Sequence, residues 1–130
     1  MKISTFELTN SRNAMGKIRL EGMEFFAYHG CFAEEQIIGT RFVVDLEFTY
    51  DTAKAEADDH LADAVNYQDV YRVVKEEMEK KSYLIEHVAR RILDAVRSSF
   101  PGITHAEIRI SKVNPPIGGK VAQVCCVLEE

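Results

Sequence analysis

The sequence predicts an α+β fold: a four-stranded antiparallel sheet with two helices on one face, in the order β-β-α-α-β-β. Two observations lead to this prediction. Segments near both ends of the chain alternate apolar and polar residues, which is typical of strands with one wet face. Between them, apolar residues recur at helical spacing in two successive segments. Hairpins at both ends with a helix pair between them favour helices on one face of the sheet.

The first hairpin is expected to use strands over residues 17–29 and 42–50. In the first strand the alternation changes phase at Gly22, where a β-bulge is expected. Residues 30–39 form the connecting loop, with a short helical turn at 34–36. The second strand alternates cleanly, and its apolar residues are Phe42, Val44, Leu46, Phe48 and Tyr50.

Two helices are expected after an acidic connection over residues 51–64, which itself contains a little helix. The first helix begins at Tyr67, and its apolar face consists of Val70, Val73, Val74 and Met78. Ser82 is expected to break the helical pattern and to cap the second helix. That helix ends before Pro101-Gly102, a stop signal, and its apolar face consists of Ile85, Val88, Ala89, Ile92 and Val96.

The last hairpin is expected over residues 106–111 and 121–128, with Pro115-Pro116 and Gly118-Gly119 in its turn. The predicted edge strands are long, and one of them contains no proline. An edge of this kind is often covered by pairing with another subunit.

Length and composition limit the classes of protein. The 130 residues fit one domain, which we expect over 17–130, with an N-terminal tail or extension over 1–16. A formal net charge of −5 argues against broad nucleic-acid binding and against docking on anionic membranes. The N-terminal residues resemble no signal peptide, so the expected location is cytoplasmic. The 3 cysteines are then expected to be small buried hydrophobes, not disulfides.

Several familiar chemical motifs are missing from the sequence. There is no Cys-x-x-Cys and no pair of histidines spaced to hold zinc on a helix. There is no glycine-rich phosphate loop and no Gly-x-Ser-x-Gly elbow. We therefore expect no metal site, no cofactor and no nucleophilic serine.

Four residues are candidates for a site, although each also has an ordinary structural interpretation. Glu86 falls in the first turn of the second helix, where any carboxylate is favoured by the free N–H groups. Tyr67 begins the first helix on the same face as Val70, as a half-buried core tyrosine would. Lys112 ends a strand, and Glu35 lies in a loop; both are ordinary places for surface charge.

Taken together, however, the chain from about residue 17 to 128 resembles the dihydroneopterin aldolase family of the tunnelling-fold superfamily. One such segment would be weak support, but several in the right order and on this pattern of elements are specific. The segments that carry the resemblance are Gly22-Met23, Tyr28-His29-Gly30 with Glu35 and Gly39, Val65-Asn66-Tyr67, Leu84-Ile85-Glu86-His87, and Ile110-Ser111-Lys112 with Pro115-Pro116.

The resemblance implies a lyase that cleaves 7,8-dihydroneopterin by a retro-aldol reaction, with neither a metal nor a Schiff base. The products would be 6-hydroxymethyl-7,8-dihydropterin and glycolaldehyde, and 2′-epimerase activity would be possible in addition. It implies that Lys112, Tyr67 and Glu35 are catalytic. It also implies that Glu86 anchors the pterin, with Ile85 and Val65 as further substrate-binding residues. Lys120 is a second lysine near the turn and competes with Lys112 for the assignment.

The resemblance further implies a homo-oligomer, an octamer of two tetrameric rings, with each active site between subunits. One alternative is an epimerase of dihydroneopterin or its triphosphate, although the sequence shows no arginine cluster for a triphosphate. Another is a non-catalytic oligomeric pterin-binding protein, which would not need Tyr67, Glu86 and Lys112 together. Zinc-dependent pterin enzymes of the same fold are disfavoured by the missing histidine pairs.

Overall fold

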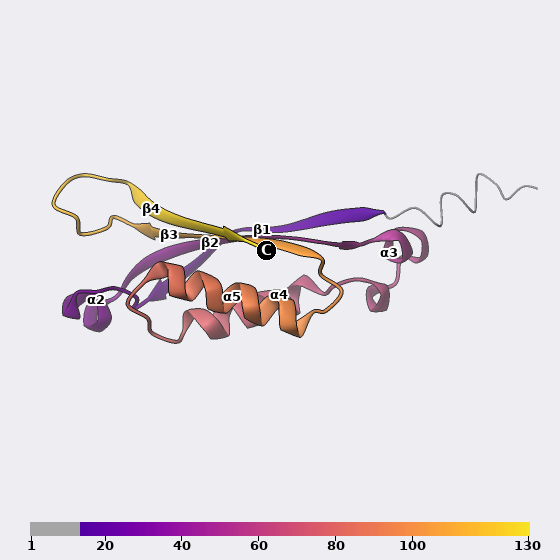
Figure 1. The fold of residues 1–130 in the computed structure, drawn as a ribbon, viewed down its shortest axis with the longest axis horizontal. Coiled ribbons are helices and arrows are strands. Elements are labelled where there is room, and N and C mark those ends of the chain that lie inside the picture. The colour runs from indigo at the N-terminus through magenta and orange to yellow at the C-terminus, as the bar shows by residue number, and fades with distance from the viewer. Residues whose placement is uncertain (1–13) are drawn as a thin grey trace, which may run out of the picture.

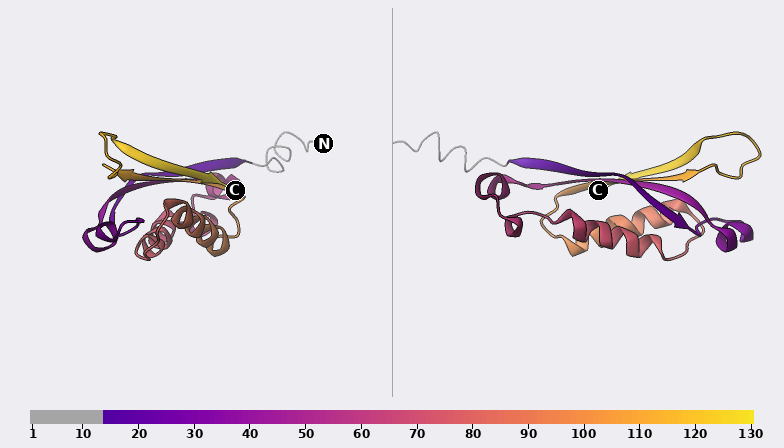
Figure 2. Two further views of the ribbon diagram at one scale, coloured as in Figure 1. Left: turned by 60° about the vertical axis from the view of Figure 1, so that its left-hand side comes forward. Right: turned by 180° about the vertical axis from the view of Figure 1, so that it is seen from behind.

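The computed structural model describes residues 14–130, and it has the predicted α+β architecture. Four antiparallel strands form one sheet in the spatial order β1-β2-β3-β4. Figure 1 shows α4 and α5 lying side by side beneath this sheet, and Figure 2 shows the same two layers from other directions. Both figures place the short helices α2 and α3 at opposite ends of the molecule. The fold prediction is confirmed.

The elements follow the predicted order closely. Their bounds are β1 Met15–Ala27, α2 Ala33–Ile38, β2 Thr40–Asp51, α3 Ala53–Asp58, η1 Leu61–Asp63, α4 Tyr67–Met78, α5 Ile85–Ser99, β3 His105–Val113 and β4 Gln123–Glu129. Strand β1 begins two residues before the expected start of the domain. The rest of the N-terminal tail predicted over 1–16 lies outside the described residues, apart from Ala14, whose carbonyl accepts a hydrogen bond from the backbone N–H of Thr52.

The phase change in the first strand is a β-bulge, as its sequence predicted. Glu21 and Gly22 together lie opposite the single residue Asp45, and the register shifts between Leu20 and Met23. Gly22 has a φ of 71°, a left-handed conformation that glycine adopts without a Cβ penalty. Its N–H donates a hydrogen bond to Asp45 Oδ1 at 2.7 Å. The bulge moves the apolar residues of both halves of β1 onto the same face of the sheet.

The core lies between the sheet and the two long helices. It contains the inward residues of β2 and β3 and the apolar stripes of α4 and α5. Each fully buried aliphatic or aromatic side chain contributes about 1.5–3 kcal/mol to stability. The completely buried members include Phe42, Val44, Phe48, Val70, Val74, Val88, Ile92, Leu93, Ile108 and Ile110. All but Leu93 were among the apolar positions whose spacing defined the predicted strands and helices.

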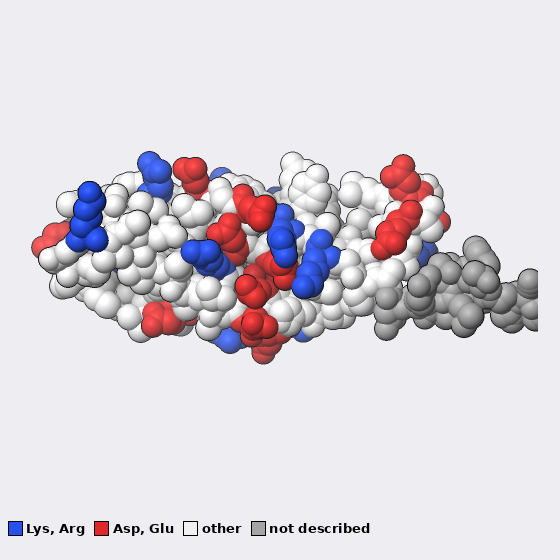
Figure 3. Space-filling model, turned by 90° about the horizontal axis from the view of Figure 1, so that it is seen from above, with Lys and Arg blue, Asp and Glu red and all other residues white. Residues whose placement is uncertain are grey.

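The other face of the sheet is strongly charged and is covered by no helix of residues 14–130 (Figure 1). Figure 3 shows acidic and basic side chains together over the middle of this face. Arg19 Nε lies 2.6 Å from Glu47 Oε1, and Lys17 Nζ lies 3.7 Å from the second oxygen of Glu47. These are exposed pairs of small energetic value. No helix in the described part of the chain is long and apolar enough to cross a membrane.

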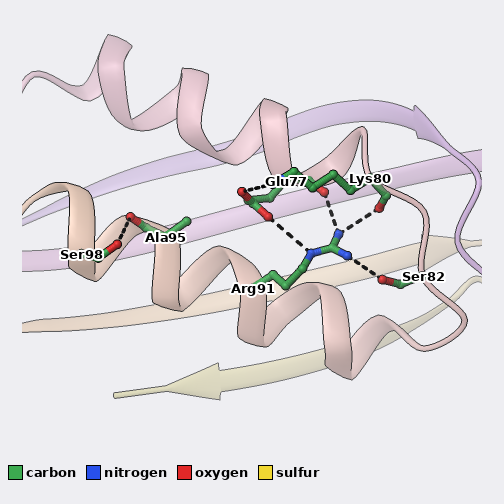
Figure 4. A network of polar contacts seen from close by, with 6 residues as sticks. All are labelled: Glu77, Lys80, Ser82, Arg91, Ala95 and Ser98. Atoms are coloured by element: carbon green, nitrogen blue, oxygen red, sulfur yellow. Dashed lines mark hydrogen bonds and ion pairs between the residues drawn. The ribbon is translucent and has the colours of Figure 1, made fainter.

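The junction between α4 and α5 differs from the prediction for Ser82. The N-cap of α5 is Leu84, which makes no side-chain capping bond, so Ser82 does not cap this helix. Ser82 is buried instead, and its hydroxyl accepts a hydrogen bond from Arg91 Nη1 at 2.7 Å (Figure 4). Ser82 lies two residues before the N-cap, so the side chain at the capping position is that of Leu84, which has no acceptor for the first-turn N–H groups.

The prediction that the cysteines are buried is wrong for two of the three. Cys31 and Cys125 are exposed, and Cys126 is half-buried. The adjacent Cys125 and Cys126 lie on β4, an edge strand with one face away from the helices. Alternate residues of such a strand point outward whatever their hydrophobicity.

His29 makes the stability of the fold sensitive to acid. Its side chain is buried, and its Nδ1 accepts a hydrogen bond from the Ser82 backbone N–H at 3.2 Å. Burial, followed by the positive charge of Arg91 and, more weakly, that of Lys112, lowers the pKa of His29 to about 4, although the Met78 carbonyl opposes this shift. The folded state therefore holds a neutral imidazole at neutral pH.

We expect the free energy of unfolding to fall as the pH drops from about 6.5 towards 4. In this window the unfolded chain binds a proton at His29 that the folded chain does not, at up to about 1.4 kcal/mol per pH unit. The free energy of unfolding, measured by urea denaturation at several pH values in this range, should fall less steeply with decreasing pH for His29→Gln than for the wild type. The exposed His60 supplies the matched control, His60→Gln. Parallel curves for the wild type and His29→Gln would contradict this account.

Candidate active site

A pocket of about 420 Å³ opens where β3 ends and α5 begins. Its walls come from the loop before α2, the first turn of α5, the end of β3 and the β3–β4 hairpin. Four of the predicted site residues line it: Glu35, Ile85, Glu86 and Lys112. The structure therefore brings together side chains that are as much as 77 positions apart in sequence.

An ion pair between Lys112 and Glu35 lies in this pocket. Lys112 Nζ donates to Glu35 Oε2 at 2.7 Å, and only 13% and 11% of the two side chains are exposed. Lys112 pairs in register with Phe42 on β2, and its ammonium lies 5.8 Å from the centre of that ring. The strand end and the buried ring beneath it fix the lysine at the pocket floor.

Glu35 is held as an anion by several donors. Its Oε1 accepts from the Phe32 backbone N–H at 3.3 Å, because the third residue of α2 reaches back to the start of its helix. Burial raises the pKa of Glu35. The hydrogen bond and charge of Lys112, together with the N–H groups of Phe32 and Cys31, lower this pKa by more than burial raises it. The net effect is a pKa below the usual value, so the carboxylate is charged at neutral pH.

Glu86 lies on another wall of the pocket, in the first turn of α5. It is exposed, and the structure gives its carboxylate no ion-pair partner among the described residues. A carboxylate with open acceptor positions can receive two hydrogen bonds from one edge of a flat ligand.

Tyr67 and Val65 do not belong to this pocket. They line a second hollow of about 770 Å³ together with residues of β1 and with Tyr50, Leu61 and Tyr71. Because Tyr67 begins α4 while Glu86 begins the antiparallel α5, the two residues lie at opposite ends of the helix layer (Figure 1). Tyr67 is 63% exposed and is not the half-buried tyrosine that its helical position suggested.

The pocket also contains residues that the sequence did not single out as site residues. They are Cys31, Phe32, Tyr83, Leu84, Pro115, Pro116, Ile117, Val124, Cys125 and Cys126. Leu84 adjoins a predicted residue, and the two prolines belong to a predicted turn, so adjacency was a usable signal for these three. Lys120 is exposed and does not line the pocket, which favours Lys112 over Lys120. Within residues 14–130, no group of three or more His, Cys, Asp or Glu is placed to hold a metal ion.

The fold and the pocket define a small α+β enzyme-like domain that combines a partly buried lysine–carboxylate pair with a second, open carboxylate. Comparison with known proteins specifies the class. The family model of FolB, described as dihydroneopterin aldolase, matches residues 18–129. The chain therefore belongs to the dihydroneopterin aldolase family.

Individual relatives agree with the family match. The dihydroneopterin aldolase of Streptococcus pyogenes serotype M18 is 42% identical over 116 residues, covering 88% of this chain and 98% of the relative. That of Bacillus subtilis is 39% identical over 111 residues, covering 85% and 92%. The crystal structure of E. coli dihydroneopterin aldolase in complex with neopterin has a TM-score of 0.81 and 25% identity. It covers 88% of this chain and 98% of that one.

Proposed function

We propose that this chain catalyses the retro-aldol cleavage of 7,8-dihydroneopterin in folate biosynthesis, with the pocket at the start of α5 as its pterin site. The family match and its relatives support the activity. The observation that carries the placement of the site is the partly buried Lys112–Glu35 pair, which shares one pocket with the open carboxylate of Glu86. The exposed free cysteines are compatible with a reducing compartment, and we place the enzyme in the cytoplasm.

The chemistry needs only proton transfers from the protein, because the substrate carries its own electron sink. Loss of the proton from the 2′ hydroxyl lets the C1′–C2′ bond break, and its electrons move through C6 onto N5 of the dihydropterin. Glycolaldehyde leaves, and protonation of the resulting enamine at C1′ gives 6-hydroxymethyl-7,8-dihydropterin. Positioning and general acid–base catalysis are therefore what the pocket must supply.

Glu86 is proposed to hold the pterin ring. The ring edge offers an exocyclic amine and a ring N–H, two donors that one carboxylate accepts together. Ile85 and Leu84 lie beside Glu86 on the same wall and supply apolar contacts to the flat ring. Neopterin is the ligand in the E. coli structure.

Lys112 is proposed to accept the proton of the 2′ hydroxyl as the free amine, directly or through a water molecule, which leaves it as the ammonium paired with Glu35. Glu35 is proposed to orient both the lysine and the substrate hydroxyls. The position of Lys112 at the pocket floor, 2.7 Å from Glu35, supports this pairing of roles. Tyr67 is proposed to hydrogen-bond the reacting region and to help protonate C1′. That role requires a second chain, because Tyr67 lies at the opposite end of its own subunit.

We therefore propose that each active site is completed by a neighbouring subunit in an octamer of two rings, which presents its Tyr67 and Val65. Two features support an assembly. Strands β1 and β4 are the edges of the sheet, and β1 is 13 residues long. Large apolar side chains are exposed in both hollows: Phe32 and Tyr83 in the pocket at the start of α5, and Leu61 and Tyr67 in the second hollow. Phe26, Ile37 and Ile38 are exposed as well. Exposed apolar surface on this scale is typical of protein–protein contact.

The activity is tested by incubating the protein with 7,8-dihydroneopterin and separating the pterin products. Release of glycolaldehyde with an equal amount of 6-hydroxymethyl-7,8-dihydropterin is the expected result. Accumulation of the 2′ epimer alone would instead identify an epimerase. Tight binding of the substrate without turnover would identify a binding protein.

Activity should survive removal of metal ions. The electron sink is the substrate's own C6=N5 bond, so no Lewis acid is needed for the carbon–carbon cleavage. Dialysis against EDTA should leave the turnover number within about twofold of the untreated enzyme. A large loss that added zinc restores would contradict the proposed mechanism.

A further inference from the structure

The segment before α2 lies directly against the loop before α5, and a set of hydrogen bonds ties them together. Gly30 N–H donates to the Ser82 carbonyl at 3.0 Å, and Ser82 N–H donates to His29 Nδ1 at 3.2 Å. One residue further along, Cys31 Sγ donates to the Tyr83 carbonyl at 3.5 Å. Residues 29–31 are thus held alongside residues 82–83, which lead into the pocket wall that carries Glu86.

Ser82 is in turn fixed by Arg91 of α5, as Figure 4 shows. Arg91 Nη1 donates to Ser82 Oγ at 2.7 Å, and Nη2 donates to the carbonyls of Glu77 at 2.8 Å and Lys80 at 2.9 Å. Arg91 Nε lies 3.4 Å from Glu77 Oε1. The planar guanidinium therefore joins the end of α4, the connecting loop and α5 at one point.

Gly30 continues this chain of contacts to the proposed catalytic pair. It is buried, and a Cβ built on it would lie 2.4 Å from Cδ and Oε1 of Glu35. Its backbone does not adopt a positive φ, so space and not backbone conformation requires glycine here. The carboxylate that holds Lys112 therefore rests on the bare Cα of Gly30.

We propose that Gly30 and Ser82 are positioning residues of the reaction. Ser82 holds the backbone of Gly30, and the missing side chain of Gly30 leaves the space in which the carboxylate of Glu35 contacts Lys112. The role in catalysis rests on the proposed function, in which Lys112 moves the proton. The close contact between Gly30 and the Glu35 carboxylate does not rest on the proposed function, because it is a property of the unliganded protein. An added methyl group at Gly30 must displace the carboxylate or the loop, and a displacement of about 1 Å in a catalytic group can cost about 100-fold in rate.

The first experiment compares Gly30→Ala with Gly102→Ala. Gly102 is a matched control because a Cβ there meets nothing within 4 Å and its φ is not positive. We expect Gly30→Ala to lower kcat by about 10- to 100-fold, while the dissociation constant of neopterin changes less than about threefold. Gly102→Ala should match the wild type in both. A rise in KM with kcat unchanged would show that Gly30 shapes the binding slot, and would overturn the proposal.

A double-mutant comparison separates positioning from a general loss of structure. If Gly30 acts through the Glu35–Lys112 pair, Gly30→Ala should change the residual kcat of Lys112→Ala by less than about twofold. An undiminished effect in the Lys112→Ala background would overturn the proposal. Ser82→Ala, with the exposed Ser98→Ala as its control, should lower kcat in the same selective way even if Gly30→Ala does not fold. Equal kcat in Ser82→Ala and Ser98→Ala would count against Ser82.

The last measurement needs no substrate, so its outcome is independent of the proposed function. Carbon-13 NMR titration of the Glu35 carboxylate reports whether it still faces the Lys112 ammonium. In the wild type and in Gly102→Ala, the Glu35 pKa should lie below its usual value. In Gly30→Ala it should rise, because the contact with Lys112 is lost while burial persists. An unchanged Glu35 pKa in a folded Gly30→Ala protein would show that Gly30 does not position the Glu35 carboxylate, even if the wild type cleaves dihydroneopterin.

Discussion

Replacing Lys112 with Ala should lower the turnover number by roughly 10²- to 10⁴-fold, the usual range for a general acid–base group. The ammonium is the cation that pairs with Glu35 in the pocket, and the pocket wall offers no other lysine among the described residues. Affinity for neopterin should change much less, because the ring is held by Glu86 on another wall. Steady-state kinetics with 7,8-dihydroneopterin, together with neopterin titration, separates the two effects.

Two further lysine variants make this prediction specific. Lys112→Arg should not restore turnover, because a guanidinium stays protonated at any working pH and cannot accept a proton. Lys120→Ala should remain near the wild-type rate, since Lys120 is exposed and outside the pocket. If Lys112→Ala raised only KM, the lysine would be a binding group, and the proton would have to be moved by another residue.

Glu86→Gln should weaken pterin binding by about 2–4 kcal/mol, or roughly 30- to 800-fold. A carboxylate accepts two donors from the pterin edge, whereas an amide accepts one and turns its own NH₂ towards the other. Titration with neopterin measures the change. Thermal stability should be nearly unaffected, because Glu86 is exposed and makes no ion pair in the described structure.

Glu76→Gln is the control for this substitution. Glu76 is an exposed carboxylate on α4 and is not part of the pocket wall, so its loss removes the same charge from the protein without touching the site. Unchanged neopterin affinity in a stable Glu86→Gln protein would remove Glu86 from the pterin site.

The sheet and the long helices were predictable because their apolar periodicity reports directly on burial. Every apolar position that defined α4 and α5 in the sequence is buried or half-buried, and the phase change at Gly22 is a bulge. Ser82 could not be placed in the same way. Its sequence position fits a cap, but its partner Arg91 is nine residues away, and only the packed junction shows which bond the hydroxyl makes.

The site was predictable in part, but from a different signal than apolar periodicity. Neither the charge nor the spacing of Glu35 and Lys112 predicts that they form an ion pair. The resemblance to a family indicated both residues, and the fold brings Lys112 Nζ within 2.7 Å of Glu35 Oε2. The close contact between Gly30 and Glu35 was not predictable, since nothing in the sequence around a loop glycine shows which atoms would lie where a Cβ would be. The separation of Tyr67 from Glu86 follows from the antiparallel helix pair and was implied only through the family's inter-subunit site.

The most direct test of the shared site is a mixing experiment with two weakened variants, Lys112→Ala and Tyr67→Phe. The two proteins are mixed in equal amounts, dissociated and allowed to reassemble at random, and turnover is measured against each variant reassembled alone. If a site combines Lys112 of one chain with Tyr67 of its neighbour, about a quarter of the reassembled sites have both groups intact. Activity should then rise towards about a quarter of the wild-type value. If both residues serve the same site from one chain, every site has a lesion, and a mixture no more active than its parents would contradict the account.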